Sequence, residues 1–371
     1  MLNTVAFRFL LLGMVMVLCV GCATTPKGQS VDFRDAAHPA WSLKGEDDGM
    51  KVAVSPARQT LQMAGSTGLL LGAGISALSN AKHRKSVRSA LEGYDAGAAF
   101  GERIDAALQK NMNADLQRVA PLDLAAKPGR PLEVRRERAA MLSKAGVDWL
   151  LDTSIEFGLY GAASELAVRL ACDLRRFPGA KKEWKKSILV DDAPILAHEH
   201  LKDPTDRVKP SFGSPKLKVN KDALRQWTED HAGFIAQYES LCDGAVAAML
   251  HGLGLEESAA GAFWLGRGAV YEKDWAEGKA YFDAAAALDP THWDARASGA
   301  VCSARLGDMD GAIAATRALL EEAPEHGPAH FNLAWWQAME KGDMAPARVH
   351  YDKAVSMGMP REKKLEKKLK I

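Results

Sequence analysis

Two groups of residues in this sequence have types and spacings that could support chemistry on a small ligand. Gly72–Ala77 has the glycine spacing of a dinucleotide-binding loop, in which backbone N–H groups and a helix N-terminus hold a pyrophosphate. Such a loop follows its strand directly, yet fifteen residues separate Pro56, where the preceding strand should end, from Gly72. His198 and His200 would share one face of a strand, but no third ligand follows at the spacing of a zinc site. We therefore expect no nucleotide site and no metal site, and we place the two histidines in a surface loop.

The chain also lacks the usual motifs for bond chemistry. It has no Gly-x-Ser-x-Gly elbow, no His-Glu-x-x-His helix, no P-loop and no Cys-x-x-Cys pair. Carboxylates are numerous, but their spacing singles out no general acid and base pair. We expect a protein that is not an enzyme and binds no cofactor. A hydrolase of envelope polymers is the alternative, and it would need paired carboxylates or a metal in a cleft within residues 50–250.

A further residue with distinctive chemistry, Cys22, directly follows Gly21 at the end of an apolar segment. Arg8 precedes a nearly unbroken apolar run from residue 9 to residue 20, and the chain becomes polar immediately after Cys22. The run is too short to span a bilayer, which takes about 20 apolar residues. This layout predicts a secretory signal peptide over residues 1–21 that is removed by cleavage. An ordinary signal peptide without lipid and an uncleaved anchor are the alternatives.

The Gly21-Cys22 junction resembles the lipobox of bacterial lipoproteins, although Cys19 stands where a lipobox usually has Leu, Val or Ile. The resemblance implies that Cys22 becomes the first residue of the mature chain and carries acyl chains on its sulfur and its amine. Ala23 and Thr24 follow Cys22, with no Asp. By resemblance to Gram-negative lipoproteins, this implies sorting to the outer membrane, on its periplasmic face. The membrane would then be the partner at this end of the chain.

The composition is that of a nearly neutral globular protein. The 48 Lys and Arg residues balance 47 Asp and Glu residues, and a net charge of +1 argues against nucleic-acid binding. After the signal peptide, no apolar run reaches the length of a membrane span. Of the cysteines that remain beyond Cys22, Cys172 and Cys242 fall in one predicted domain. They could pair in an exported protein, and small buried thiols are the other interpretation.

The middle of the chain has the pattern of an α/β domain. Residues 22–49 are polar with little periodicity and predict a flexible tether. Residues 50–254 then alternate strand and helix patterns, beginning with a strand over 51–55. Strands over 147–157 and 166–174 have apolar residues at every second position, and a Phe-Pro-Gly turn leads into an antiparallel partner. The expected fold is an α/β sandwich on a mixed sheet. Its order of elements resembles the periplasmic lipoprotein domains of the curli-secretion and penicillin-binding-protein-activator type, which implies an envelope-assembly context and no particular activity.

Among the segments after the signal peptide, residues 63–78 come closest to a membrane span. Gly65, Gly68 and Gly72 fall three and four apart, as in helices that pack closely together. We expect a buried helix or loop here. Contact with the bilayer, or with a neighbouring subunit of a homo-oligomer, is the alternative, since the run is too short to span a membrane alone.

An internal repeat occupies residues 255–371. Pro290 and Pro324 lie 34 residues apart, and three small residues recur at the same interval. These small residues are Gly266, Ala300 and Ala334. The period resembles that of tetratricopeptide repeats (TPR), which implies pairs of antiparallel helices stacked into an all-α array. Three units fit the sequence, the third with about one extra residue before Gly342, and a charged capping helix follows over residues 361–371.

The TPR resemblance also assigns groove positions, because the first helix of each unit lines a concave surface. They fall on Phe263, Arg267, Tyr271, Asp294, Arg305, Phe331 and Trp335. Aromatic and arginine side chains are common anchors for a bound peptide or helix. Arg267, Tyr271 and Arg305 are the leading candidates, because several of the others could be core between units.

These features predict a lipid-anchored periplasmic adaptor. Cys22 would fix the protein to the outer membrane, and the TPR groove would bind a protein partner in envelope assembly, secretion or polysaccharide export. The alternative is an oligomeric secretion or export component of the outer membrane, with bilayer contact by residues 63–78.

Overall fold

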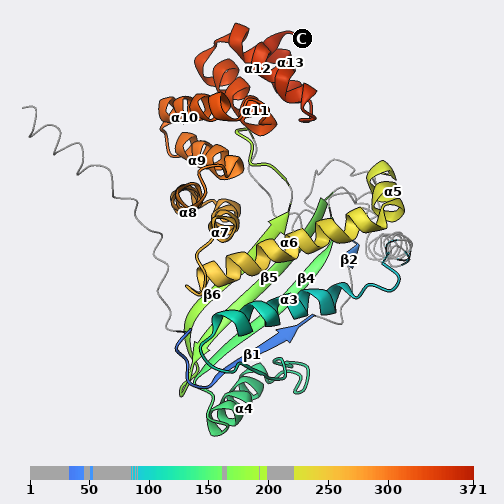
Figure 1. Ribbon diagram of the computed structural model, residues 1–371, viewed down its shortest axis with the longest axis vertical. Helices are drawn as coiled ribbons and strands as arrows, with labels where there is room; N and C mark the ends of the chain where they lie inside the picture. The colour runs from blue at the N-terminus through green and yellow to red at the C-terminus, as the bar shows by residue number, and fades with distance from the viewer. Residues whose placement is uncertain are drawn as a thin grey trace, which may run out of the picture.

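The computed structural model describes residues 33–45, 51–52, 91–160, 165–191, 193–198 and 221–371, together with residues 85, 87 and 89 (Figure 1). The predicted signal peptide, Cys22, the Gly72–Ala77 loop and residues 63–78 lie outside the described residues. None of the helices in the described part of the chain is long and apolar enough to cross a membrane.

The first half of the described chain forms one mixed sheet. Its six strands run in the order β3-β1-β4-β5-β6, and β2 lies beside β4. Strands β1 and β2 are parallel to β4, whereas β4, β5 and β6 are antiparallel neighbours. The strands are β1 (Pro39–Lys44), β2 (Lys51–Val52), β3 (Gln117–Arg118), β4 (Trp149–Tyr160), β5 (Glu165–Arg176) and β6 (Lys181–Asp191). The mixed sheet predicted from the sequence is therefore present.

Two helices cover one face of this sheet. They are α3 (Ala96–Asn111) and α6 (His231–Gly252), which lie across the strands (Figure 1). Every second residue of β5 from Leu166 to Leu174 is buried in the core that these helices share with the sheet, including Leu170. Each such leucine stabilises the fold by about 1.5–3 kcal/mol when it is fully buried. The polar residues between them, such as Arg169, fall on the opposite face because side chains alternate along a strand.

The opposite face of the sheet is covered at one end by α4 (Pro131–Lys144). Leu142 of this helix packs with Ala40, Leu150 and Phe177 in a small separate core. The short helix α5 (Lys221–Glu229) leads into α6.

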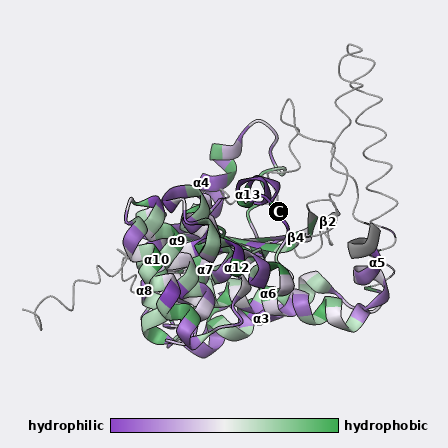
Figure 2. Cartoon of the chain, turned by 90° about the horizontal axis from the view of Figure 1, so that it is seen from above, coloured by the Kyte–Doolittle hydropathy of each residue, from purple (hydrophilic) through white to green (hydrophobic). Residues whose placement is uncertain are grey.

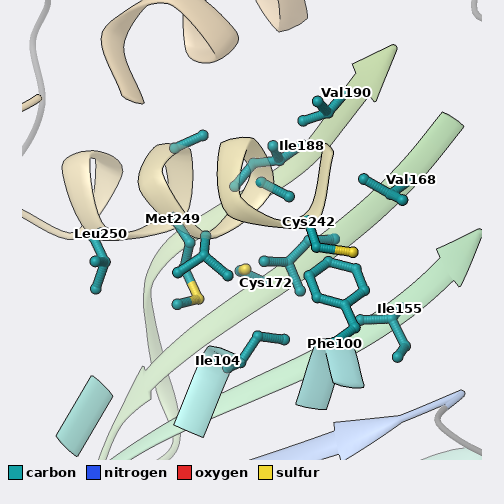
Figure 3. Close-up of a cluster of buried hydrophobic side chains, with 14 of the residues drawn as sticks. Phe100, Ile104, Ile155, Val168, Cys172, Ile188, Val190, Cys242, Met249 and Leu250 are labelled. Atoms are coloured by element: carbon teal, nitrogen blue, oxygen red, sulfur yellow. The ribbon is translucent and has the colours of Figure 1, made fainter. Parts of the chain in front are cut away.

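The cysteines of the sheet domain are unpaired. Cys172 and Cys242 are free and buried, and both belong to the core between the sheet and its helices (Figure 3). Burial raises the pKa of the Cys242 thiol to about 12, and it raises the pKa of Cys172 far above its usual range. Both groups therefore remain protonated and act as small apolar core residues.

The sheet domain begins earlier in the chain than the sequence predicts. The predicted tether of residues 22–49 contains β1, in which Trp41 is fully buried. The Thr153 hydroxyl donates to the Ser42 carbonyl at 2.6 Å, and the Asp148 carboxylate accepts from the Ala37 and His38 backbone N–H groups. The tether prediction is therefore wrong for residues 33–45. A six-residue strand between polar neighbours gives a weak sequence pattern, and only its pairing with β4 reveals it.

The second half of the chain is helical, as the repeat predicts. Three helix pairs are followed by a short capping helix, and the members of each pair pack on one another. The helices are α7 (Ala259–Tyr271), α8 (Trp275–Leu288), α9 (Trp293–Arg305), α10 (Met309–Glu322), α11 (Gly327–Trp336), α12 (Met344–Ser356) and α13 (Lys363–Leu369). The lysine-rich α13 is hydrophilic over most of its surface (Figure 2).

The extra residue of the third unit is absorbed by a π-helical turn. This turn, η5 (Gln337–Lys341), continues α11 without a break and ends at Gly342, whose φ of 73° is left-handed. A π turn accommodates one inserted residue inside a helix, which keeps the rest of the unit in register.

The helical repeats pack directly on the sheet domain. Helix α7 contacts both α6 and the edge strand β6. A Cβ atom on Gly244 of α6 would lie 2.5 Å from the Trp264 indole nitrogen, so only glycine permits this approach. Lys186 of β6 also bonds to Glu277 of α8 at 3.1 Å. The repeat helices therefore cover the edge of the sheet at β6.

Candidate peptide-binding face

The first helices of the three units, α7, α9 and α11, form a continuous surface that we call the inner face. A segment of the chain itself lies on it. Asp191, the last residue of β6, and residues 193–198 together form a segment that we call the β6 extension, which rises toward α11 (Figure 1). Ile195, Leu196 and Ala197 are buried in the core of the repeats.

The inner face holds the backbone of the β6 extension at alternate carbonyl groups. Arg267 of α7 donates to the Ala193 carbonyl at 2.6 Å. The Asn332 amide of α11 donates to the Ile195 carbonyl at 3.2 Å, and Arg305 of α9 donates to the Ala197 carbonyl at 2.8 Å. Each of the three units therefore contributes one side chain to the same segment.

Asn332 has a second role in this contact. Its side-chain oxygen accepts the Ala197 backbone N–H at 2.7 Å, while its nitrogen donates to the Ile195 carbonyl. A side-chain amide that satisfies both a donor and an acceptor of a peptide backbone imitates a neighbouring strand. Asn332 is buried away from water, so these two bonds give its side-chain amide the hydrogen-bond partners that a buried polar group needs.

An acidic anchor begins the β6 extension. The Asp191 carboxylate is 2 % exposed and accepts hydrogen bonds from both Arg267 and Tyr271. Burial raises the pKa of the Tyr271 hydroxyl above its usual range. Burial also disfavours the Arg267 charge, but Asp191 and Tyr271 more than offset it and raise the Arg267 pKa. The guanidinium stays charged, and the rings of Phe263, Trp264 and Tyr271 surround it with centroids 5.2–5.9 Å away.

His198 ends the described part of the extension between aromatic rings. Its ring centroid lies 5.0 Å from that of Phe331 and 5.0 Å from that of Trp335. The side chain is only 12 % exposed, and its Nε2 atom lies 3.8 Å from the Glu362 carboxylate. The surface loop predicted for His198 is therefore wrong, because the repeats bury this residue; His200 lies outside the described residues.

The structure separates the predicted groove residues into two sets. Arg267, Tyr271, Arg305, Phe331 and Trp335 contact the β6 extension.

The remaining two predicted residues pack within the repeats, and each contacts the next unit. Phe263 packs on Phe282 and on His292, with ring centroids 5.7 and 4.7 Å apart. Asp294 accepts a hydrogen bond from His326 of the next unit at 3.1 Å. Neither of these residues has a hydrogen bond or ring contact with the described part of the extension.

Sequence reasoning missed Asn332, the residue with the most specific contact. It follows the predicted groove residue Phe331 and lies on the 34-residue period after Trp264 and Ser298. Tracing that row of the repeat could have singled it out as a polar side chain on the inner face. The described residues bring together no group of three His, Cys, Asp or Glu side chains that could hold a metal ion.

A comparison with known protein families agrees with the helical architecture. Residues 269–335 match the tetratricopeptide repeat family. A solved structure, the crystal structure of YrrB, "a TPR protein with an unusual peptide-binding site", shares 20% sequence identity with this chain. The match covers 38% of this chain and 71% of that chain, with a TM-score of 0.27. A search of curated proteins found no significant match. Residues 269–335, from the end of α7 to α11, are therefore similar to tetratricopeptide repeats.

Proposed function

We propose that this protein is a lipid-anchored adaptor on the periplasmic face of the outer membrane, whose inner face binds a peptide segment of a partner protein. The Gly21-Cys22 junction supports the lipid anchor, and the tetratricopeptide repeats support the protein partner. The resemblance of the α/β domain to envelope lipoproteins favours envelope assembly, secretion or polysaccharide export as the process. The protein acts by recruitment and positioning rather than by bond chemistry.

One observation carries the peptide-binding part of this proposal: the inner face already holds a non-helical peptide, the β6 extension. The side chains of Arg267, Asn332 and Arg305 bind backbone carbonyls. Carbonyl groups are common to all peptides, so these contacts do not depend on the side chains of the bound segment. A partner segment can therefore use the same donors once the β6 extension leaves.

The side chains of the β6 extension indicate which partner segments would fit. Asp191 neutralises the buried Arg267, and the small or aliphatic residues Ala193, Ile195 and Ala197 follow it at alternate positions. A matching partner segment has an acidic residue followed by small and aliphatic residues at the same spacing. An unmatched segment would leave the Arg267 charge buried without a counter-ion, which is strongly unfavourable.

A labelled synthetic peptide of residues 189–200 tests this function. Two receptors are compared. The first is the full chain with Cys22→Ala. The second is the same chain with Ile195→Asp and Leu196→Asp added, which place charges in the apolar contact between the extension and the inner face. We expect the second receptor to bind the peptide at least about tenfold more tightly, because its own extension no longer competes. A scrambled peptide is the control for non-specific binding.

Adding Asn332→Ala to the second receptor, whose own extension no longer competes, should weaken peptide binding about tenfold, since two hydrogen bonds to the peptide backbone are lost. If neither receptor binds the peptide while both keep the same thermal unfolding transition, the inner face is a permanent domain contact and the adaptor proposal fails.

The lipid anchor is tested separately by fractionation of cells that express the full chain. When membranes are washed at high salt, which removes proteins held by charge alone, the wild type should stay in the membrane fraction and the Cys22→Ala variant should be released. Retention of this variant after the high-salt wash would exclude a lipid anchor at Cys22.

A further inference from the structure

Two segments of this chain that pack against each other carry an excess of positive charge. Residues 127–144, which include α4, and residues 173–185, which form the tip of the β5–β6 hairpin, together hold eleven basic and four acidic residues. Their net charge of +7 contrasts with +1 for the whole chain, so all other residues together are net acidic. We call these two segments the basic end.

The two segments of the basic end lie against each other. Leu142 of α4 packs with Phe177 of the hairpin in one apolar cluster. Between them is a shallow hollow of about 470 Å³, lined by Leu132, Arg135, Arg136 and Arg175 among others. Arg135 and Arg136 are exposed, and within the described residues neither has an ion-pair or hydrogen-bond partner.

An apolar side chain stands beside these arginines. Leu132 is 69 % exposed, more than any other large apolar side chain in the described part of the chain. Leu132, Arg135 and Arg136 fall three and four residues apart, so they share one face of α4. A face that combines exposed leucine with unpaired arginine is typical of helices that lie on a phospholipid surface.

The start of the described chain lies next to the basic end. The Phe33 ring centroid is 6.1 Å from that of Trp149, and the Arg176 guanidinium of the hairpin lies 5.2 Å from the same Trp149 ring. Ten residues separate Cys22 from Phe33. Such a length of chain reaches at most about 40 Å, so lipid on Cys22 would keep this end near the membrane.

We propose that the basic end lies on the anionic phospholipid leaflet that holds the acyl chains of Cys22. Guanidinium groups bind lipid phosphates through paired hydrogen bonds, and Leu132 inserts among the headgroups. The repeat units lie at the opposite end of the long axis (Figure 1), so they stand away from the membrane. This inference rests on the proposed lipid anchor for its orientation.

The lysine-rich helix α13 is the rival membrane contact. It is also strongly basic, but it belongs to the far end of the repeats (Figure 1). A bilayer on α13 would lie far from Phe33, where the short connection to Cys22 begins.

Vesicle co-sedimentation of the full chain with Cys22→Ala tests the basic end without the help of acyl chains. We expect binding to vesicles of phosphatidylcholine with about 30% phosphatidylglycerol, no binding to phosphatidylcholine alone, and release at high salt. Adding Arg135→Glu and Arg136→Glu should weaken binding to the anionic vesicles at least about tenfold. The matched control, Lys367→Glu with Lys368→Glu on α13, makes the same charge change and should leave binding unchanged.

The outcomes separate this inference from the proposed anchor. If the chain does not bind anionic vesicles, or if only the α13 variant loses binding, the basic-end proposal is overturned, whatever the fractionation of Cys22→Ala shows. If the α4 variant loses binding but Cys22→Ala stays in the membrane fraction of cells after a high-salt wash, the basic end stands and the lipid anchor fails. Thermal unfolding monitored by circular dichroism should be the same for all three proteins, because the altered side chains are on the surface.

Discussion

Asp191 and Arg267 show how a single pair of residues joins the two halves of this chain. The carboxylate belongs to the last residue of the sheet, the guanidinium belongs to the first repeat helix, and both side chains are almost inaccessible to water. Two buried charges stabilise each other only when both are present, because each has lost its hydration.

Removing one member of this pair should therefore destabilise the protein strongly. We expect Arg267→Met or Asp191→Leu alone to lower the free energy of unfolding by about 3–5 kcal/mol, and the double variant to cost less than either single change. Urea unfolding measures these values. Lys279→Met is the control, since the Lys279–Asp283 pair is exposed and worth about 0–1 kcal/mol. Single variants that cost under about 1 kcal/mol would contradict the buried pair.

A pair of histidines makes the third repeat sensitive to acid. His330 donates from Nε2 to the Pro324 carbonyl at 2.9 Å, so its Nδ1 atom accepts the Nδ1–H of His350 at 2.8 Å. Burial, together with the nearby His330, Lys353 and Arg317, lowers the pKa of His350 to about 4. Both rings are therefore neutral in the folded protein at neutral pH.

The lowered pKa sets the direction of the pH dependence. The unfolded chain takes up a proton on His350 near pH 6.5, whereas the folded chain does so near pH 4. Stability is full above the higher value and falls as the pH drops between the two, by about 1–2 kcal/mol after allowance for solvent screening of the partly exposed ring. Urea unfolding of the wild type and of His350→Phe across this range should show a flatter curve for the variant. Equal slopes would contradict a neutral buried pair.

At the level of elements, the repeat helices are set by short local signals. Asp274 and Asp308 each follow the preceding helix and cap the next one, where their carboxylates accept the backbone N–H three residues later. Such caps satisfy N–H groups that have no partner within the helix.

Loss of one cap should have a moderate and predictable effect. Asp308→Ala should lower the free energy of unfolding by about 1 kcal/mol, because it removes the 2.9 Å bond to Gly311. Asp310→Ala on the same helix is the control; its side chain is 86 % exposed and should contribute less than about 0.5 kcal/mol. Urea unfolding distinguishes the two, and equal losses would contradict the capping role of Asp308.

Elements with a regular period could be predicted from the sequence, and elements defined by distant contacts could not. The 34-residue spacing of Pro290 and Pro324 predicted the helix pairs, and alternation predicted β4 and β5. Strand β1 could not be predicted, because its six residues form a strand by pairing with β4, which lies more than a hundred residues later in the chain.

The binding of the β6 extension to the inner face could not be predicted for the same physical reason. Its partners lie 74 to 137 residues further along the chain, so no local pattern records the contact. The sequence identified Arg267, Tyr271 and Arg305 as anchors for a peptide, but it could not show that this chain supplies a peptide of its own.

The whole molecule has two different ends. One carries the basic surface and the start of the described chain, and the other carries the repeat units that hold the β6 extension (Figure 1). The adaptor that we propose would use this division, with one end at the membrane and the other accessible to a partner. The central claim is that the inner face is a peptide-binding surface from which the β6 extension can be displaced.

Hydrogen exchange of the Ala197 amide, followed by NMR on the isotope-labelled full chain with Cys22→Ala, tests this claim most directly. In the protein alone this amide should exchange slowly, because it donates to the buried Asn332 side chain. A saturating amount of unlabelled peptide of residues 189–200 should make it exchange at least about tenfold faster, while core amides such as that of Leu170 in β5 stay unchanged. Unchanged protection of Ala197 at saturating peptide would show that the extension never leaves the inner face, and it would contradict the account.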